Sequence, residues 1–131
     1  DPAHVEKTFS VSDTQVKGEV ETAVQEILSL GPKALLLKRG SSGVRIHICS
    51  EQGGEERIEC PGFPVEIQNV LGAGDAFAAG FLYGYVHDWD WYESGRFGNA
   101  CGAIVVTRHG CSASMPTYEE VEAFVKERGG L

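Results

Sequence analysis

The stretch 69–80, Asn-Val-Leu-Gly-Ala-Gly-Asp-Ala-Phe-Ala-Ala-Gly, decides the fold, because a glycine-bounded turn in it opens directly into a helix. A short strand is predicted just before it, at 65–67. The first N–H groups of a helix have no partner within the helix, and they carry the positive end of its dipole. Gly72, Ala73 and Gly74 have little or no side chain, so an anion can approach their amides closely. The sequence therefore predicts an anion-binding turn.

Asp75 lies in the first turn of the helix, which we predict from about residue 75 to 86. The helix dipole stabilises a carboxylate there, so this residue type by itself often does no more than begin a helix. Beside an anion-binding turn it has a second use. Phosphoryl transfer needs one element that holds the developing charge and another that accepts the proton of the attacking hydroxyl. The combination predicts that Asp75 is catalytic.

Other phosphate-binding loops fit this turn less well. The chain contains neither the Walker A pattern GxxxxGK[ST] nor the HRD and DFG motifs of protein kinases. A dinucleotide-binding GxGxxG turn is the closest rival, and acidic residues follow it at a suitable distance (Asp88, Asp90 and Glu93). Phe77, however, occupies the third glycine position, where close helix–strand packing requires Gly or Ala. The alternatives are a dinucleotide-binding module and a truncated domain without catalytic activity.

The rest of the chain alternates between strand and helix patterns, which predicts an α/β fold in one partial domain, 1–131. An apolar helical face begins at Val16, and Gly31-Pro32 ends it. The apolar run 34–37 predicts a strand that is covered on both faces. The further predictions are a turn at 38–43, strands at 44–48 and 57–60 around a hairpin tip at 52–54, a helix that ends near Gly110 with Arg108 and His109 in its last turn, and a final helix to about residue 128 with a capping box of Thr117 and Glu120.

Composition and charge narrow the range of partners. The 131 residues carry a formal net charge of −8, which disfavours nucleic acid and anionic lipid but does not exclude ATP. No apolar run reaches the roughly 18 residues of a membrane span. The start, 1–4, has neither an initiator Met nor the basic and apolar stretches of a signal peptide, so we expect a fragment of a cytoplasmic protein. Its cysteines are expected to be reduced: Cys49, Cys60, Cys101 and Cys111.

The anion-binding turn resembles a family signature. Residues 71–77, LGAGDAF, resemble the second signature of the PfkB carbohydrate kinases, usually written DTxGAGDxF. Residues 37–43, LKRGSSG, resemble the nucleotide turn of that family, (T/K)xGxxG, and residues 99–108 resemble its helix beside the adenine. The turn and this helix are most similar to the branch that phosphorylates 5-dehydro-2-deoxy-D-gluconate in myo-inositol catabolism. The resemblance covers about residues 20–128.

This resemblance implies a three-layer α/β/α, ribokinase-like (Rossmann-like) fold, of which the chain is the C-terminal part without the N-terminal half and its β-strand lid. It implies ATP-dependent phosphorylation of the primary hydroxyl of a sugar or sugar acid. Asp75 would be the general base, and 72–74 the anion hole for the γ-phosphate. Mg²⁺ would arrive bound to ATP. The nucleotide would be lined by Lys38, Gly40, Gly43, Asn99 and Ala103. A potassium ion would be held, mainly through backbone carbonyls, by Asn69, Leu71, Val106, His109 and Ser114.

Two departures from the family pattern bear on these expectations. Asn69 and Val70 stand where the family has Asp and Thr, which removes a charge beside the implied potassium site. The sugar-binding half of the family pattern is absent, so we expect negligible kinase activity from this polypeptide alone. Apolar surface that is open for lack of that half predicts self-association, for example as a homodimer.

Overall fold

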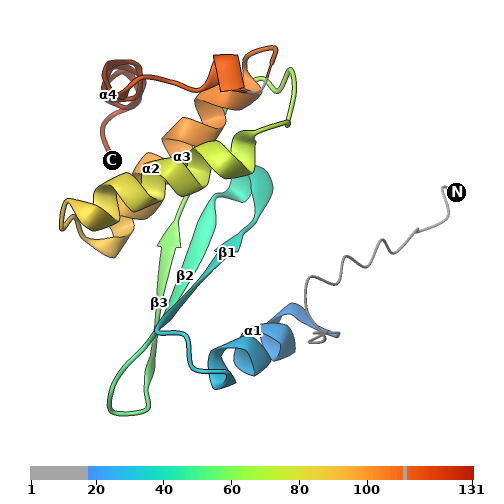
Figure 1. Cartoon of the computed structure of the whole chain (residues 1–131), viewed down its shortest axis with the longest axis vertical. Coiled ribbons are helices and arrows are strands. Elements are labelled where there is room, and N and C mark those ends of the chain that lie inside the picture. Colours follow the sequence, from blue (N-terminus) through green and yellow to red (C-terminus); the bar gives the residue numbers. More distant parts are fainter. Residues whose placement is uncertain (1–17, 111) are drawn as a thin grey trace, which may run out of the picture.

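A three-stranded antiparallel sheet, in the order β1-β2-β3, forms the centre of the computed structural model, which describes residues 18–110 and 112–131 (Figure 1). The strands are β1 (Ala34–Lys38), β2 (Val44–Cys49) and β3 (Glu55–Cys60). The helices are α1 (Val20–Ser29), α2 (Ala73–Val86), α3 (Trp91–Val106) and α4 (Tyr118–Glu127), with 3-10 turns at Gly40–Ser42 and Ser112–Ser114. None of the helices in these ranges is long and apolar enough to cross a membrane.

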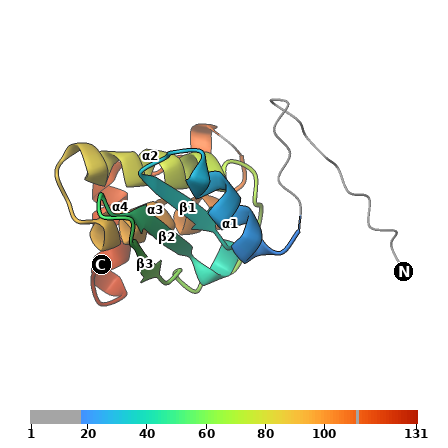
Figure 2. The same ribbon diagram turned by 90° about the horizontal axis from the view of Figure 1, so that it is seen from below.

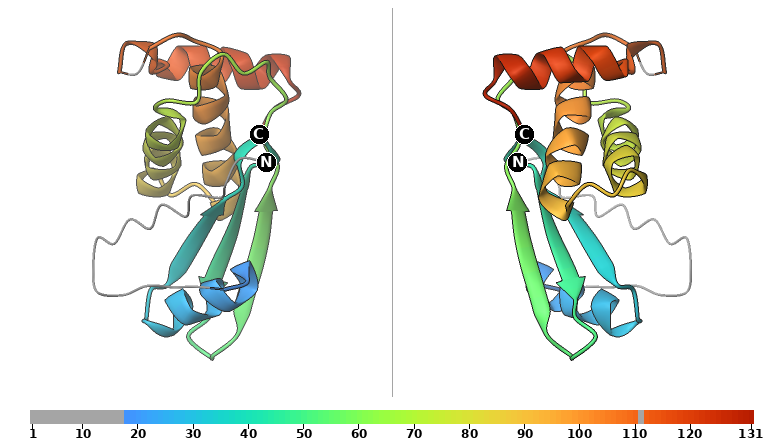
Figure 3. Two further views of the ribbon diagram at one scale, coloured as in Figure 1. Left: turned by 90° about the vertical axis from the view of Figure 1, so that its right-hand side faces the viewer. Right: turned by 90° about the vertical axis from the view of Figure 1, so that its left-hand side faces the viewer.

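Helices cover both faces of the sheet. Successive side chains of a strand point to opposite faces, so each strand contributes side chains to both layers of packing. From β2, Val44 and Ile46 are buried against Phe77 and Phe81 of α2. His47, which follows Ile46 and points to the opposite face, is buried on the face that α1 covers. The views in Figures 2 and 3 show α1 on one side of the sheet and the α2–α3 pair toward the other. The layers are thus those of the implied α/β/α fold.

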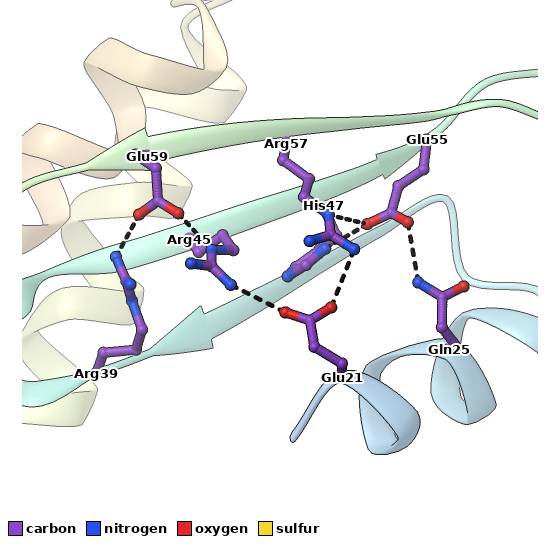
Figure 4. Close-up of polar contacts among 8 residues, drawn as sticks. All are labelled: Glu21, Gln25, Arg39, Arg45, His47, Glu55, Arg57 and Glu59. Carbon is purple, nitrogen blue, oxygen red and sulfur yellow. Dashed lines mark hydrogen bonds and ion pairs between the residues drawn. The ribbon is translucent and has the colours of Figure 1, made fainter. Parts of the chain in front are cut away.

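Charged and polar side chains fasten α1 to the sheet (Figure 4). Glu21 of α1 accepts a hydrogen bond from Arg57 of β3 at 3.0 Å. Gln25, one helical turn further on, donates to Glu55 of β3 at 2.9 Å. Glu55 also pairs with the buried ring of His47. The helix is therefore held by a polar network as well as by its apolar face.

The helices α2, α3 and α4 enclose a second core beside the sheet. A Cβ built on Gly80 of α2 would lie 2.6 Å from the Cys101 Sγ and 3.0 Å from the Gly98 Cα, so the two helices can approach this closely only without a side chain there. The small-residue side of α2 therefore packs against another helix. The buried residues of this core are Phe63, Ala76, Phe97, Ala100, Cys101, Ala103, Ile104, Val105, Val121 and Val125.

Several predicted elements need correction. Residues 65–67 form no strand, because no strand lies beside them in the described ranges. The amides that follow, those of Gln68 and Asn69, donate instead to the Val106 carbonyl at 2.7 and 3.2 Å. The helix α2 begins at Ala73, earlier than predicted. The strand β1 is only half buried, rather than covered on both faces, because it is an edge of this sheet.

The C-terminal boundary of α3 also differs from the prediction. The helix ends at Val106, so Arg108 and His109 lie beyond its last turn. The α4 capping box is confirmed, because Thr117 accepts from the Glu120 amide and the Glu120 carboxylate accepts from the Thr117 amide. Two further predictions, the helix start at Val16 and the state of Cys111, lie outside the described residues.

Candidate active site

The start of α2 has the geometry of an anion-binding turn. Gly72 caps the helix in the left-handed conformation, with φ of 83°, and supplies no side-chain acceptor to the first amides. Within the described part of the chain, the amides of Gly74 and Asp75 have no hydrogen-bond acceptor. Open amides at the positive end of a helix attract anions.

Lys38, the last residue of β1, brings a positive charge to this turn. A Cβ built on Gly74 would lie 2.8 Å from the Lys38 Nζ, so the ammonium lies directly beside the helix start. The same Nζ lies 6.0 Å from the centre of the Phe77 ring. None of the ion pairs formed among the described residues includes Lys38. An unpaired ammonium next to open amides strengthens the attraction for a phosphate group.

A cavity of about 300 Å³ opens beside the turn. Every residue predicted to line the nucleotide contributes to its wall, although the five come from two distant segments. The lining consists of Lys38 at the end of β1, Gly40, Ser41 and Gly43 after β1, Gly62, Phe63, Ile67 and Val70 before α2, Ala73, Gly74 and Phe77 of α2, and Asn99, Gly102, Ala103 and Val106 of α3.

The apolar wall of this cavity was not anticipated from the sequence. Phe63, Ile67 and Val70 resemble ordinary core residues, and an apolar residue type by itself does not distinguish a core from a pocket wall. In the structure, Ile67 is 55% exposed and Val70 is 69% exposed. An apolar wall that ends at a cationic, amide-rich turn is suited to a flat ring system that carries phosphate groups.

Asp75 is exposed at the same helix start and is not part of the cavity lining. Its amide belongs to the open turn, and its side chain forms no hydrogen bond or ion pair with the described residues. The carboxylate is therefore free to accept a proton from a group that approaches the turn from solvent.

The glycines of the turn between β1 and β2 are required by the backbone. Gly40 and Gly43 have φ of 58° and 90°, in the left-handed region. The Arg39 amide donates to the Gly43 carbonyl at 2.8 Å, which closes the turn. A Cβ on Gly43 would overlap the backbone of Cys60 and Gly62, so this turn lies directly against the segment that follows β3.

Asn99 lines the cavity, but its amide nitrogen is already used within the protein. The Nδ2 donates to the carbonyls of Cys60 and Pro61 at 2.9 and 3.0 Å. These bonds tie α3 to the end of β3. A contact between Asn99 and a ligand would therefore depend on its Oδ1 acceptor. Ala103, one helical turn further on, leaves the wall smooth on that side.

The five residues implied for a monovalent cation fall into two groups. The Val106 carbonyl accepts from the Asn69 amide at 3.2 Å, and the Asn69 Oδ1 accepts from the Leu71 amide at 2.9 Å. Separately, the His109 carbonyl accepts from the Ser114 hydroxyl at 2.9 Å. The His109 carbonyl keeps a second lone pair, whereas the Val106 carbonyl already accepts from the amides of both Gln68 and Asn69. No hydrogen bond in the described ranges joins the two groups. These ranges also contain no cluster of three His, Cys, Asp or Glu side chains suited to a metal ion.

The open helix start, the unpaired lysine and the cavity give this α/β protein a site whose geometry and charge suit a phosphate group. The chain belongs to the pfkB family of carbohydrate kinases, whose family model matches residues 6–118. It is similar to the 5-dehydro-2-deoxygluconokinase of Clostridium botulinum strain Alaska E43, with 34% identity over 112 residues, which are 86% of this chain and 32% of the relative. The relative from Geobacillus kaustophilus is 33% identical over 115 residues, 88% of this chain and 33% of the relative. The chain thus spans about a third of the length of these relatives.

Solved kinase structures share the fold. A ribokinase from Thermotoga maritima has a TM-score of 0.74 and 36% identity, over 82% of this chain and 35% of that one. A putative ribokinase II from E. coli, solved in complex with ATP and Mg²⁺, has a TM-score of 0.75 and 28% identity, over 85% of this chain and 34% of that one. The structure is therefore part of a ribokinase-like α/β fold.

Proposed function

We propose that the protein carrying this chain transfers the γ-phosphoryl group of ATP to the primary hydroxyl of a sugar or sugar acid. This chain would supply the nucleotide side of the site and the general base. One observation carries the proposal: the unpaired Lys38 ammonium, the open amides of Gly74 and Asp75 and the exposed Asp75 carboxylate meet at a single helix start. Phosphoryl transfer needs a positive cradle and a proton acceptor at one place.

The residues of this chain would divide the work. Asp75 would accept the proton of the attacking hydroxyl. The open amides of Gly74 and Asp75 and the Lys38 ammonium would hold the negative charge on the oxygens of the transferred group, whereas the Ala73 amide already donates to the Val70 carbonyl at 3.3 Å. The adenosine would occupy the cavity, whose 300 Å³ lies at the lower end of the roughly 300–1,000 Å³ of ligand pockets. Its ring would lie against Gly102 and Ala103 of α3.

Two kinds of metal ion are proposed for this site: Mg²⁺ bound to ATP, and a monovalent cation held mainly by backbone carbonyls. Mg²⁺ binds through phosphate oxygens and water as readily as through carboxylates, so it would arrive with ATP; the ATP–Mg²⁺ complex of the E. coli relative supports this. A monovalent cation such as potassium would neutralise further charge beside the turn. Its proposed ligands are the residues that the family resemblance implies: Asn69, Leu71, Val106, His109 and Ser114.

The substrate that the relatives favour is 5-dehydro-2-deoxy-D-gluconate, an intermediate of myo-inositol catabolism. The support is the name of the relatives that are 33–34% identical to the chain. Because the chain spans about a third of their length, we expect no turnover from it alone. Self-association remains a prediction, because several apolar side chains are exposed, among them Val70, Leu71, Leu82 and Val86. Analytical sedimentation would test it.

The alternative dinucleotide-binding module receives less support from the structure. Its GxGxxG turn requires a strand immediately before the first glycine, so that the turn joins a sheet to a helix. In the described ranges the residues before Gly72 are not a strand, and they hydrogen-bond to the end of α3 instead. The third hypothesis, a truncated domain without activity, differs from the kinase only in turnover.

Calorimetric titration of this chain with MgATP and with NAD tests the nucleotide preference. We expect heat from MgATP at micromolar to millimolar concentrations and none from NAD. Turnover is tested in a protein that carries this chain together with the remainder of the kinase fold, by coupling ADP release to NADH oxidation with 5-dehydro-2-deoxy-D-gluconate as acceptor. Binding of NAD in preference to MgATP would refute the proposal, and so would the absence of ADP release with every sugar and sugar acid offered.

A further inference from the structure

The buried Arg96 of α3 is joined to the backbone between β3 and α2. Its Nη1 donates to the Pro61 carbonyl at 2.6 Å and to the Gly62 carbonyl at 3.3 Å. Its guanidinium carbon lies 3.8 Å from the centre of the Phe63 ring. The residue is only 9% exposed, and none of the ion pairs formed among the described residues gives it a carboxylate partner.

A buried cation without a counter-ion is energetically unfavourable, so Arg96 does more than fill space in the core. Removing the charge from water is unfavourable, and only well-formed hydrogen bonds offset that cost. An apolar side chain such as Met would fill the same volume without that cost. Arg96 instead donates from its Nη1 to two successive carbonyls while its guanidinium lies over an aromatic ring. Met can form neither contact. The arrangement fixes the position of the segment 61–62.

That segment is the surface on which the glycine turn between β1 and β2 rests. A Cβ on Gly43 would overlap the Cys60 oxygen and the Gly62 nitrogen, and a Cβ on Gly62 would overlap the Ser41 oxygen. The two backbones therefore touch without intervening side chains. A displacement of 61–62 must be transmitted to the turn, because packed backbones cannot yield as side chains do.

We propose that Arg96 is a positioning residue for the nucleotide, which acts through 61–62 on the turn 40–43. The inference rests on the proposed function, since that turn lines the proposed ATP cavity. Arg96 itself is not in the cavity lining, so it would not contact the ligand. Asn99 supports it from the next turn of α3, because its Nδ2 donates to the Pro61 carbonyl as well.

The chain offers a matched control in Arg128. Its guanidinium carbon lies 3.7 Å from the centre of the Phe124 ring and its Nη1 donates to the Phe124 carbonyl at 3.3 Å, but Arg128 lies at the end of α4 and does not line the cavity. Arg96→Met and Arg128→Met therefore both remove a cation–ring contact and a hydrogen bond to a backbone carbonyl, and Arg128→Met also removes an ion pair with Glu127. Arg96→Lys keeps the charge and loses the two-carbonyl geometry, and Val121→Ala lowers stability through the α4 core without touching either arginine.

The experiment measures the MgATP dissociation constant of this chain by calorimetry and, without ligand, amide hydrogen exchange in the peptide that contains 40–43. For Arg96→Met we expect an increase of about tenfold in the dissociation constant and faster exchange in that peptide. Arg96→Lys should show a smaller change of the same kind. Arg128→Met and Val121→Ala should change neither quantity, even where Val121→Ala lowers the melting temperature.

Unchanged exchange at 40–43 in both Arg96 variants overturns the inference. It is also overturned if Val121→Ala accelerates exchange at 40–43 as much as Arg96→Met does, because the effect would then be general destabilisation. If Arg96→Met does not fold, Arg96→Lys decides in the same assays. If the unmodified chain binds no MgATP, the proposed function fails for this chain, and the exchange measurement alone still decides whether Arg96 positions the turn.

Discussion

The ammonium of Lys38 lies beside Gly74, where a Cβ on the glycine would be only 2.8 Å from it. The two residues are 36 positions apart in the chain, from the end of β1 and the start of α2 (74 − 38 = 36). Gly74 thus serves two purposes, since its lack of a side chain opens the helix amides and leaves room for the lysine. The positive charge of Lys38 and the positive end of the α2 dipole therefore lie at one place, which suits an anionic ligand.

Replacing Lys38 by Met should weaken MgATP binding about tenfold, because one charge-assisted contact to phosphate is lost. The dependence of the dissociation constant on ionic strength should also become shallower. Calorimetry at two salt concentrations measures both effects. Lys33→Met, an exposed lysine just before β1, is the control and should bind MgATP as before. Equal affinity of the two variants would show that Lys38 does not contact the phosphates.

In a protein that carries this chain with the rest of the kinase fold, Asp75→Asn should lower kcat by about 10²–10⁴-fold, the usual contribution of a general base. MgATP affinity should change little, since the amides that would hold the phosphate remain. Steady-state kinetics and calorimetry on one preparation measure kcat and the MgATP affinity separately. Asp88→Asn, at an exposed position with φ of 59° that Asn tolerates, should leave kcat unchanged. A variant at Asp75 with near-normal kcat would remove it from catalysis.

Gly43→Ala should destabilise the fold by about 3 kcal/mol, because the new methyl group adds a steric overlap to an unfavourable φ. Gly53→Ala is the matched control: its φ of 84° is similar to the 90° of Gly43, but a Cβ there meets no atom within 4 Å. The control should lose only about 1 kcal/mol, from the backbone conformation. Urea unfolding followed by circular dichroism measures both. Similar losses for the two variants would mean that 60–62 does not press on Gly43.

The free energy of unfolding should decrease in acid, because Glu55 becomes protonated. Hydrogen bonds, first from His47 and then from Gln25 and Arg57, lower the pKa of the Glu55 carboxyl from 4.5 to about 2. Because the folded-state pKa lies below the unfolded value, this carboxylate stabilises the fold fully above about pH 4.5 and loses its effect as the pH falls toward about 2. The urea midpoint of the unmodified chain should therefore drop over this range.

Glu55→Gln should flatten that part of the pH profile and lower the midpoint at pH 7. Glu56→Gln is the control, because Glu56 is also exposed on β3 but points to the other face of the sheet. A profile for Glu55→Gln that is parallel to that of the unmodified chain between pH 4.5 and 2.5 would show that the pairing of α1 with β3 does not respond to acid.

Two cysteines should resist alkylation in the folded protein. Burial raises the pKa of the Cys60 thiol to about 11 and that of the Cys101 thiol to about 12. At pH 8 the reactive thiolate is therefore a fraction of about 10⁻³ or less. After treatment with iodoacetamide, peptide mass spectrometry should find label at the half-buried Cys49 before Cys60 or Cys101. Cys60 and Cys101 should be labelled only after denaturation. Rapid native labelling of Cys101 would mean that the α2–α3 interface opens readily.

Much of the local structure followed from the sequence. The capping box of Thr117 and Glu120 and the hairpin around 52–54 are found where their residue patterns placed them. The helix-opening turn at Gly72 was predicted to within a few residues. In each case the signal is local, since the backbone conformation depends on the residues at those positions themselves.

The predictions that failed depended on distant neighbours. Residues 65–67 have the alternation of a strand, but a strand needs another strand beside it, and here the amides of Gln68 and Asn69 donate to the end of α3 instead. The apolar run of β1 was expected to be covered on both faces, yet this strand is an edge. Arg96 attracted no attention in the sequence, because one arginine within a helix is usually exposed to solvent.

The sequence by itself determined that a glycine-bounded turn opens a helix with a carboxylate in its first turn, and which family this pattern resembles, because both depend on contiguous residues. Only the tertiary structure decided that Lys38 reaches Gly74, that an apolar wall completes the cavity, and that Arg96 holds the segment beneath the glycine turn. These contacts join residues far apart in the chain, and their formation depends on how helices and strands pack, which no local pattern records.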